Sequence, residues 1–288
     1  MIFLKISNEL EQKIIKTYNE GYSYVNTGKI CNVNPSTVQR VLKRNNVHIR
    51  NNQEKSKIYY CDENYFEVID TPEKAYWLGF IYADGYISIT HNQYKFGISL
   101  AEKDCILLKK LNFFLKSSYP INTYKQTAGY SKDTIYCRLL ISSQKIVEDL
   151  IKHGVVEHKT NVLQKPNIDK HLIPHFIRGY IDGDGCITCS ERKDKTITYK
   201  VKILGTESIL DFIKAFIEEN KIATINQYYK RQPDQTVSSI DFGGNEQVRK
   251  FLDLIYKDST IHLERKYEKY LDLCRYNNFS RSKRKLLD

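Results

Sequence analysis

The sequence lacks the features of an exported or membrane-embedded protein. No apolar run approaches the roughly 18 residues that a membrane-spanning helix requires. The apolar stretch at the start of the sequence ends at the charged Lys5 and is too short for a secretory signal. We therefore expect a cytoplasmic or organellar protein, neither secreted nor bound to a membrane. Hydrophobic residues make up 41% of the chain, enough for buried cores, which excludes disorder throughout.

The seven cysteines are odd in number and scattered, which favours reduced thiols over a disulfide scaffold. One group, Cys186 and Cys189 with His171 and His175, imitates a zinc-binding set. The two cysteines fall on an expected strand, however, where positions three apart point to opposite faces. We therefore expect no structural zinc there.

Acidic residues are also in short supply. The chain has 34 Asp and Glu residues and 45 Lys and Arg residues, which gives a formal net charge of +11. A surplus of this size favours a polyanionic partner, most simply nucleic acid, although a basic surface can also serve solubility alone.

Residues 1–50 have the pattern of a small helical module. Apolar residues recur at helical spacing between Leu10 and Tyr18, a short second helix is expected over 25–31, and Asn34-Pro35 opens a third that runs through Asn45. The inner face of the third helix would be Val38, Val41 and Leu42. Its other face carries residues suited to phosphates and base edges in a major groove: Ser36, Thr37, Gln39, Arg40, Lys43 and Arg44. This module resembles the helix-turn-helix modules of recombinases and transposases; a plain three-helix lobe is the alternative. The polar segment 51–64 is read as a linker.

An internal repeat occupies the remainder of the chain. Residues 77–87 and 177–187 are similar, and their aspartates, Asp84 and Asp184, lie 100 residues apart. Matching strand and helix patterns follow each segment, with later strands expected near Tyr124, over 134–142, near Gln227 and over 237–242. We therefore expect an α+β fold of two pseudo-symmetric repeats, 65–165 and 166–288. Each reads as helix, strand pair, helix, strand pair, helix, around an antiparallel sheet.

Each repeat segment reads as the end of a helix. Pro72 and Pro174 suit the first helical turn, and Gly85 and Gly185 are expected to end the helices in a left-handed conformation. Inside the helices, small residues four apart form a bare stripe on one face: Gly79 and Ala83, then Gly179 and Gly183. Glycine in a helix interior costs about 1 kcal/mol, and backbone contact between the two helices would offset it.

Such packing brings the two aspartates together at helix C-termini, where the helix dipole is already negative. Two carboxylates there repel each other, so the arrangement makes sense around hard divalent cations, Mg²⁺ or Mn²⁺. A paired metal site suits phosphoryl displacement. The alternative is that Asp-Gly merely forms a turn after each helix.

These two segments resemble the signature helices of the LAGLIDADG homing endonucleases, in their single-chain, two-motif form. The similarity spans about residues 65 to 275. It implies paired αββαββα units whose sheets form a saddle over duplex DNA, and cleavage of both strands across the minor groove. It also implies that Asp84 and Asp184 bind the catalytic metals. Tyr82 departs from the family's aspartate, which Asp182 keeps; we do not infer a loss of activity from it.

The resemblance further implies a catalytic lysine in each half, for which Lys159 and Lys266 match by location, although either could be a solvated surface lysine. Strand alternation predicts that Ile135, Cys137, Leu139 and Ile141 face inward. The residues expected to face DNA are Lys95, Lys125, Tyr136, Arg138, Lys200, Lys202, Lys230 and Arg231.

The sequence thus predicts a monomeric, metal-dependent, site-specific double-strand DNA endonuclease, encoded by an intron or by a mobile or free-standing element. Two alternatives share the fold: an RNA maturase that assists splicing, and a catalytically silent transcription regulator. The basic run 281–285 is read as a solvated end, with a phosphate clamp as the other possibility.

Overall fold

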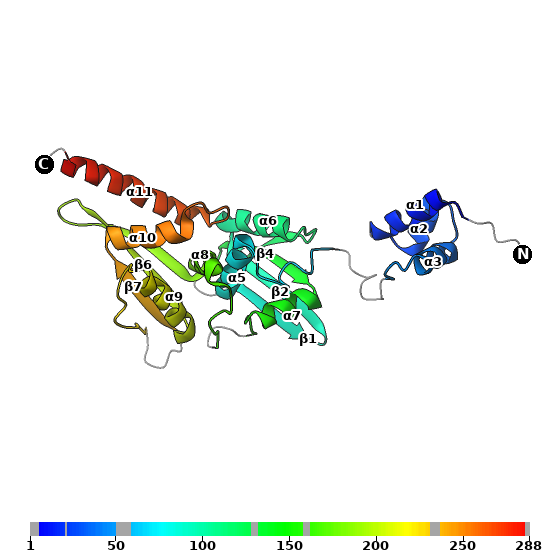
Figure 1. Cartoon of the computed structure of the whole chain (residues 1–288), viewed down its shortest axis with the longest axis horizontal. Coiled ribbons are helices and arrows are strands. Elements are labelled where there is room, and N and C mark those ends of the chain that lie inside the picture. Colours follow the sequence, from blue (N-terminus) through cyan, green and yellow to red (C-terminus); the bar gives the residue numbers. More distant parts are fainter. Residues whose placement is uncertain are drawn as a thin grey trace, which may run out of the picture. The chain divides into compact units, whose positions relative to one another are not determined.

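The computed structural model describes residues 6–20, 22–49, 59–127, 132–157, 162–230 and 237–285. The chain divides into two compact units, Met1–Tyr59 and Tyr60–Asp288 (Figure 1). Within the described ranges, no helix is both long and apolar enough to cross a membrane.

The first unit consists of three helices around a core of its own. They are α1 (Asn8–Asn19), α2 (Tyr24–Cys31) and α3 (Pro35–Arg44). The hydroxyls of Ser7 and Ser23 cap α1 and α2 by accepting backbone N–H groups, and Pro35 occupies the first turn of α3. The expected inner face of α3 is buried against residues of α1 that include Ile14. The three helices predicted from the sequence are confirmed.

The second unit begins with a four-stranded antiparallel sheet in the order β1-β2-β4-β3. Its elements are α5 (Pro72–Asp84), β1 (Gly85–Thr90), β2 (Gln93–Ala101), η1 (Glu102–Asp104), α6 (Cys105–Phe114), β3 (Ile121–Lys125), β4 (Ile135–Ser142) and α7 (Gln144–Lys152). This is the predicted order of helix, strand pair, helix, strand pair, helix.

The second repeat follows the same order, and its antiparallel sheet runs β5-β6-β7. Its elements are η3 (Lys170–Leu172), α8 (Ile173–Asp184), β5 (Gly185–Glu191), β6 (Ile197–Gly205), α9 (Glu207–Glu219), β7 (Ser238–Gly243), α10 (Asn245–Tyr256) and α11 (Glu264–Lys285). The strand expected near Gln227 is reduced, among the described residues, to one bridge between Tyr229 and Ser239. The predicted α+β fold of two repeats is confirmed.

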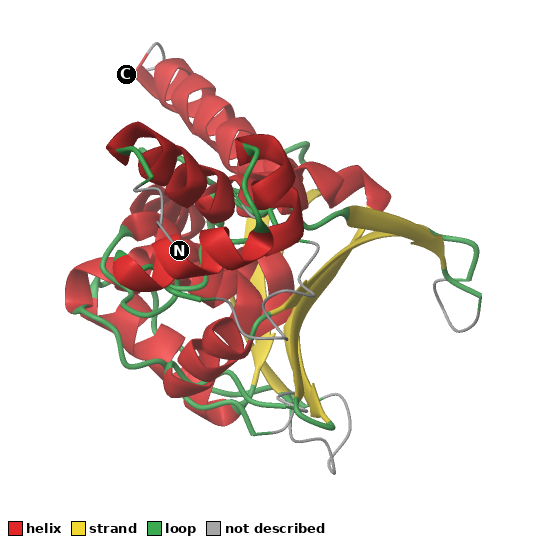
Figure 2. Ribbon diagram, turned by 90° about the vertical axis from the view of Figure 1, so that its right-hand side faces the viewer, coloured by secondary structure: helices red, strands yellow, loops and turns green. Residues whose placement is uncertain are grey.

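Among the described residues of this unit, helices cover one side of each sheet and leave the other side open. Helices α6 and α7 contact β2 or β4, and α9 and α10 contact β6 and β7. Figure 2 shows the curved strands of both sheets on one side of this unit, with most of its helices on the other. In β4 the inward residues Cys137, Leu139 and Ile141 are buried as predicted. Ile135 is 42% exposed instead, because it begins the strand beyond the edge of the core.

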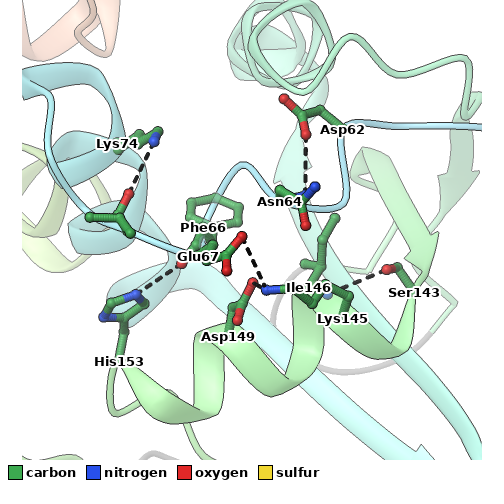
Figure 3. A network of polar contacts seen from close by, with 11 residues as sticks. Asp62, Asn64, Phe66, Glu67, Lys74, Ser143, Lys145, Ile146, Asp149 and His153 are labelled. Atoms are coloured by element: carbon green, nitrogen blue, oxygen red, sulfur yellow. Dashed lines mark hydrogen bonds and ion pairs between the residues drawn. The ribbon is translucent and has the colours of Figure 1, made fainter.

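The segment before α5 is packed onto the first repeat. Tyr60 is hydrogen-bonded through its backbone to Ser118, so residues 60–64, assigned above to the linker, are attached to the second unit. Further along, Phe66 is fully buried, and its carbonyl oxygen lies 2.9 Å from Nε2 of His153 at the end of α7 (Figure 3). Lys145 of α7 forms an ion pair with Glu67 at 3.6 Å. These contacts fix the segment that leads into α5 against α7.

Candidate active site and nucleic-acid interface

Helices α5 and α8 pack along the stripe of small residues. A Cβ atom added to Gly79 would overlap the carbonyl oxygen of Phe176, and one added to Gly179 would overlap that of Tyr76. The two contacts are related by an approximate twofold axis, since each glycine meets the residue three positions before the other glycine. One turn further, a Cβ on Gly183 would overlap that of Ala83. The helices therefore touch through their backbones.

This packing brings the last residues of the two helices together. A Cβ on Gly183 would lie 3.2 Å from Oδ2 of Asp84, so the carboxylate of α5 lies against the end of α8, one residue before Asp184. Both aspartates are partly exposed, and neither helix has a basic residue in its last turn. Two carboxylates thus stand at two converging negative helix ends.

Each aspartate is followed directly by a strand. The prediction that Gly85 and Gly185 end the helices in a left-handed conformation is wrong: both are extended, with φ of −76° and −89°. Glycine is needed for space instead. A Cβ on Gly85 would lie 2.7 Å from Cγ2 of Ile81, and one on Gly185 would lie 2.8 Å from Cγ2 of Ile181. The chain therefore turns tightly from helix to strand and holds each aspartate at the junction.

The donor set at these helix ends fits magnesium or manganese better than zinc. Within the described part of the chain, no three His, Cys, Asp or Glu side chains are grouped as metal ligands. Mg²⁺ is commonly held by one or two carboxylates, with substrate phosphates and water completing its octahedron, whereas structural zinc takes four protein ligands. Two partly exposed carboxylates match the first pattern.

Lys266 lies at the same end of α8. Its side chain is buried, and its ammonium donates to the carbonyl oxygens of Ile181, Asp182 and Gly183 at 2.7, 2.7 and 3.1 Å. Burial lowers the pKa of Lys266 to about 8, against the attraction of Asp182 and Asp84. A lysine ammonium has three N–H donors, so all three can be used by the end of the helix. Lys159 lies outside the described residues.

Asp182 is the centre of a buried polar network that sequence alone did not indicate. Its carboxylate accepts hydrogen bonds from Tyr76 (2.9 Å), Tyr256 (2.5 Å) and the backbone N–H of Leu263 (2.7 Å). Burial raises the pKa of Asp182, and the hydrogen bonds of Tyr256 and Leu263 oppose that rise. The network joins α5, the end of α10 and the residue before α11. It therefore anchors the segment that carries Lys266.

Arg178 reinforces the same anchor. The side chain is 1% exposed, and its guanidinium donates to the carbonyl oxygens of Ile255 and Ile261, both at 2.9 Å. It also lies over the ring of Tyr76, 5.2 Å from the centroid. A buried charge is stable only when its donors are satisfied, so these carbonyl groups hold the arginine and the chain together.

Tyr82 occupies the position of Asp182 in the first repeat. It is buried, and its hydroxyl donates to the carbonyl oxygen of His153 at 2.5 Å. Both side chains therefore attach the motif helix to the end of the matching helix of their own repeat, α7 or α10. The attaching group is a tyrosine hydroxyl in the first repeat and a carboxyl group in the second.

On the open side of the first sheet, an aromatic pair supports a cation. Tyr124 and Tyr136 are cross-strand partners whose rings stack with centroids 5.8 Å apart. The guanidinium of the exposed Arg138 lies 5.2 Å from the centroid of Tyr124. Lys95 is half-buried on β2, and Lys125 at the end of β3 pairs with Asp133 at 2.9 Å. Tyr124 belongs to this face but was missing from the residues expected to face DNA. Strand alternation could have indicated it, because Tyr124 lies two positions after Asn122 on β3 and therefore on the same face.

Tyr86 is a second omission on this side of the sheet. It faces Gly97 across β1 and β2, and a Cβ on that glycine would lie 2.8 Å from Cε1 of the tyrosine ring. The ring therefore covers the bare glycine while remaining 37% exposed.

The second sheet presents lysines with acidic neighbours. Lys200 and Lys202 are exposed on β6, and Lys200 pairs with Asp241 of β7 at 2.8 Å. Lys230 is exposed and lies 3.5 Å from Glu207. Arg231 lies outside the described residues. The two sheets therefore differ in the groups that they offer to a ligand.

In the first unit, the polar residues named on α3 are exposed apart from Thr37, which is half-buried. Arg44 forms an ion pair with Glu11 of α1, and the amide of the neighbouring Asn45 donates to the same carboxylate at 3.2 Å. Arg44 therefore braces α3 against α1.

The second unit is thus a two-repeat α+β protein with a pair of carboxylates at the twofold junction of two helices and an open face on each sheet. The LAGLIDADG-like domain family matches residues 71–153 and 173–256, which are more than half of the chain. The protein belongs to this family.

Solved structures share the fold at low sequence identity. The LAGLIDADG homing endonuclease I-GzeII in complex with DNA target is 13% identical with a TM-score of 0.54, over 74% of this chain and 91% of that one. A double mutant of I-SmaMI is 14% identical with a TM-score of 0.50, over 74% of this chain and 92% of that one. A comparison with curated proteins found no match.

Proposed function

We propose that the protein is a site-specific endonuclease that cuts both strands of duplex DNA with the help of Mg²⁺ or Mn²⁺. The observation that carries the proposal is the pair of partly exposed carboxylates, Asp84 and Asp184, at the converging C-terminal ends of α5 and α8. Both motif helices belong to one chain, so a monomer supplies the whole site.

Asp84 and Asp184 would hold the metal ions and fix where they bind. The ions, when bound, activate water and neutralise the charge that develops on a phosphodiester undergoing in-line displacement. The backbone contact between α5 and α8 keeps the two carboxylates at a constant separation, which positions the reacting groups.

Lys266 would act by charge rather than by proton transfer. Its N–H groups are directed to three helix carbonyls, so it neutralises the negative end of α8 and adds positive potential beside Asp184. Phosphate is attracted to such a potential. Lys159 would serve the other half in the same way, by its matched location in the sequence.

Duplex DNA would lie along the open sides of the two sheets. The I-GzeII structure of similar fold is a complex with DNA target, and a net charge of +11 suits a polyanion. Lysines on these sides would contact phosphates, while Tyr86, Tyr136 and the supported guanidinium of Arg138 would read base edges.

The experiment compares Asp84→Asn and Asp184→Asn with Asp272→Asn, which removes an exposed carboxylate from α11. Each protein is incubated with Mg²⁺ and with plasmid DNA that contains the joined flanks of its own gene. Wild type and the α11 variant should cut both strands; each active-site variant should fail to do so while binding duplex within a few fold. An active-site variant that cuts at the wild-type rate refutes the assignment.

The same substrate tests whether the gene lies within an intron or another mobile element. An intron or mobile element interrupts the site that its endonuclease recognises, so the joined flanks should be cut and the interrupted gene should not. Binding without cleavage by the wild type would instead favour a DNA-binding regulator.

A further inference from the structure

The first unit holds its last two helices in a fixed arrangement. Helix α2 ends at Cys31, Asn32 adopts a left-handed conformation with φ of 54°, and α3 begins three residues later at Pro35. A Cβ on Gly28 would lie 2.6 Å from the carbonyl oxygen of Val33, so the turn is pressed against α2. A helix pair joined by a short turn is the arrangement that places a second helix in a DNA groove.

One face of α3 is free of the core. Ser36, Gln39, Arg40 and Lys43 have the spacing i, i+3, i+4, i+7, which puts them on one side of a helix, and all four are exposed. The buried residues of α3 occupy the opposite side. Ser36 and Gln39 lie in the N-terminal half, whereas the two cations follow toward the C-terminus.

Charge is segregated in this unit. Between Gly21 and Gln53 the sequence contains no Asp or Glu, although it contains five Lys and Arg residues. The acidic residues of the described part, Glu9, Glu11 and Glu20, lie on α1 or at its C-terminal cap, and Glu11 is engaged by Arg44. Helices α2 and α3 therefore contain no carboxylate side chain, and the exposed side of α3 carries Arg40 and Lys43.

We propose that α3 is a recognition helix that enters the major groove of duplex DNA outside the cleavage site. Arg40 and Lys43 contact phosphates. Gln39 reads a base edge, because a glutamine amide can donate to and accept from adenine in the major groove, and Ser36 lies beside it in the N-terminal part of the helix. The favoured duplex is DNA, since the major groove of A-form RNA is too deep and narrow for a helix. The inference goes beyond cleavage and holds whether or not the second unit cuts.

The test uses the full chain with EDTA present, so that binding is measured without cleavage. Arg40→Ala/Lys43→Ala is compared with Lys13→Ala/Lys16→Ala, which removes the same charge from exposed positions of α1. Affinity for a mixed-sequence 60-base-pair duplex is measured from about 50 to 200 mM salt. All substituted side chains are exposed, and circular dichroism checks that the helices persist.

We expect the α3 variant to bind at least about tenfold more weakly at the lowest salt, with the slope of log K against log salt reduced by about 2, because each lost phosphate contact removes about 0.9. The α1 variant should change affinity by no more than about twofold, because its positions lie outside the proposed contact. Gln39→Ala should keep the salt slope and lose a base preference in sequences selected from a random library. Equal losses for the two double variants would overturn the proposal, as would a larger loss on duplex RNA than on DNA.

Discussion

Substitution of Gly179 by alanine tests the helix junction most directly. In an ordinary helix this change is stabilising by about 1 kcal/mol, since alanine is the better helix former. Here the added methyl would overlap the carbonyl oxygen of Tyr76 and lie 2.8 Å from the backbone nitrogen of Phe80. Carbon contacts need about 3.5 Å, and backbone atoms of a packed helix cannot turn aside as a side chain can.

The helices must therefore separate. Overpacking of a dense core costs about 1–3 kcal/mol, and the high end applies because both opposing atoms belong to the backbone. After the gain in helix propensity is subtracted, a net loss of about 2 kcal/mol remains. For a unit of this size such a loss lowers the melting temperature by about 4–8 °C.

Thermal unfolding of Gly179→Ala and of Gly243→Ala provides the comparison. At Gly243 an added Cβ would lie 3.5 Å from the carbonyl oxygen of Tyr199, an ordinary contact, so this control should melt within about 2 °C of wild type. Under the proposed function, displacement of the helices by about 1 Å should also slow cleavage by about a hundredfold. A Gly179→Ala protein that melts at or above the wild-type temperature would show that the helices are not in backbone contact.

Three further outcomes follow from the site. The pKa of Lys266 is lower in the folded chain, at about 8, than its ordinary value of 10.5, so the unfolded chain binds more protons between these values and stability rises with pH there. The unfolding free energy of wild type relative to Lys266→Met should therefore increase from pH 8 to 10 in urea titrations, by at most about 1.4 kcal/mol per pH unit; a flat or falling difference contradicts it. Asp182→Asn directs an amide toward three donors and should cost about 1–3 kcal/mol or more in the same titration, whereas Tyr82→Phe removes one hydrogen bond and should cost about 1 kcal/mol; equal costs would count against the network. Removal of divalent metal with EDTA should stop cleavage but leave duplex binding within a few fold in a gel-shift assay, and cleavage that persists in EDTA excludes the metal mechanism.

Local rules predicted most of the helices and strands of the two repeats, and they were wrong at several places where a tertiary contact decides. The positions of Gly85 and Gly185 were correct, but the reason was not: a glycine at a helix end reads alike whether it supplies a positive φ or space beside Ile81 and Ile181. Ile135 was expected to face inward and is 42% exposed, since it begins β4 beyond the edge of the core.

The polar network was beyond sequence reasoning for a different reason. Asp182 has partners at Tyr76, Tyr256 and Leu263, up to 106 residues away in the chain. Nothing local to a tyrosine indicates which buried acceptor it will meet. The long helix α11 was also missed, because its polar composition conceals the buried Tyr270 and Leu273, which share one side at a spacing of three.

The contact between α5 and α8 is nearly symmetric. Gly79 and Gly179 meet equivalent residues of the opposite helix, and a larger side chain on either one would part them both. Further from that axis, several groups differ between the repeats: a tyrosine hydroxyl against a carboxyl group as anchor, and an arginine on stacked tyrosines against Lys200 paired with Asp241. Two equivalent carboxylates would suit equivalent chemistry on the two DNA strands, since both strands have the same sugar-phosphate backbone. Two unlike sheets would suit unlike base sequences on either side of the cut. Under the proposed function, an asymmetric target would therefore be read by the sheets, because the glycine contacts between the two helices allow no larger side chain.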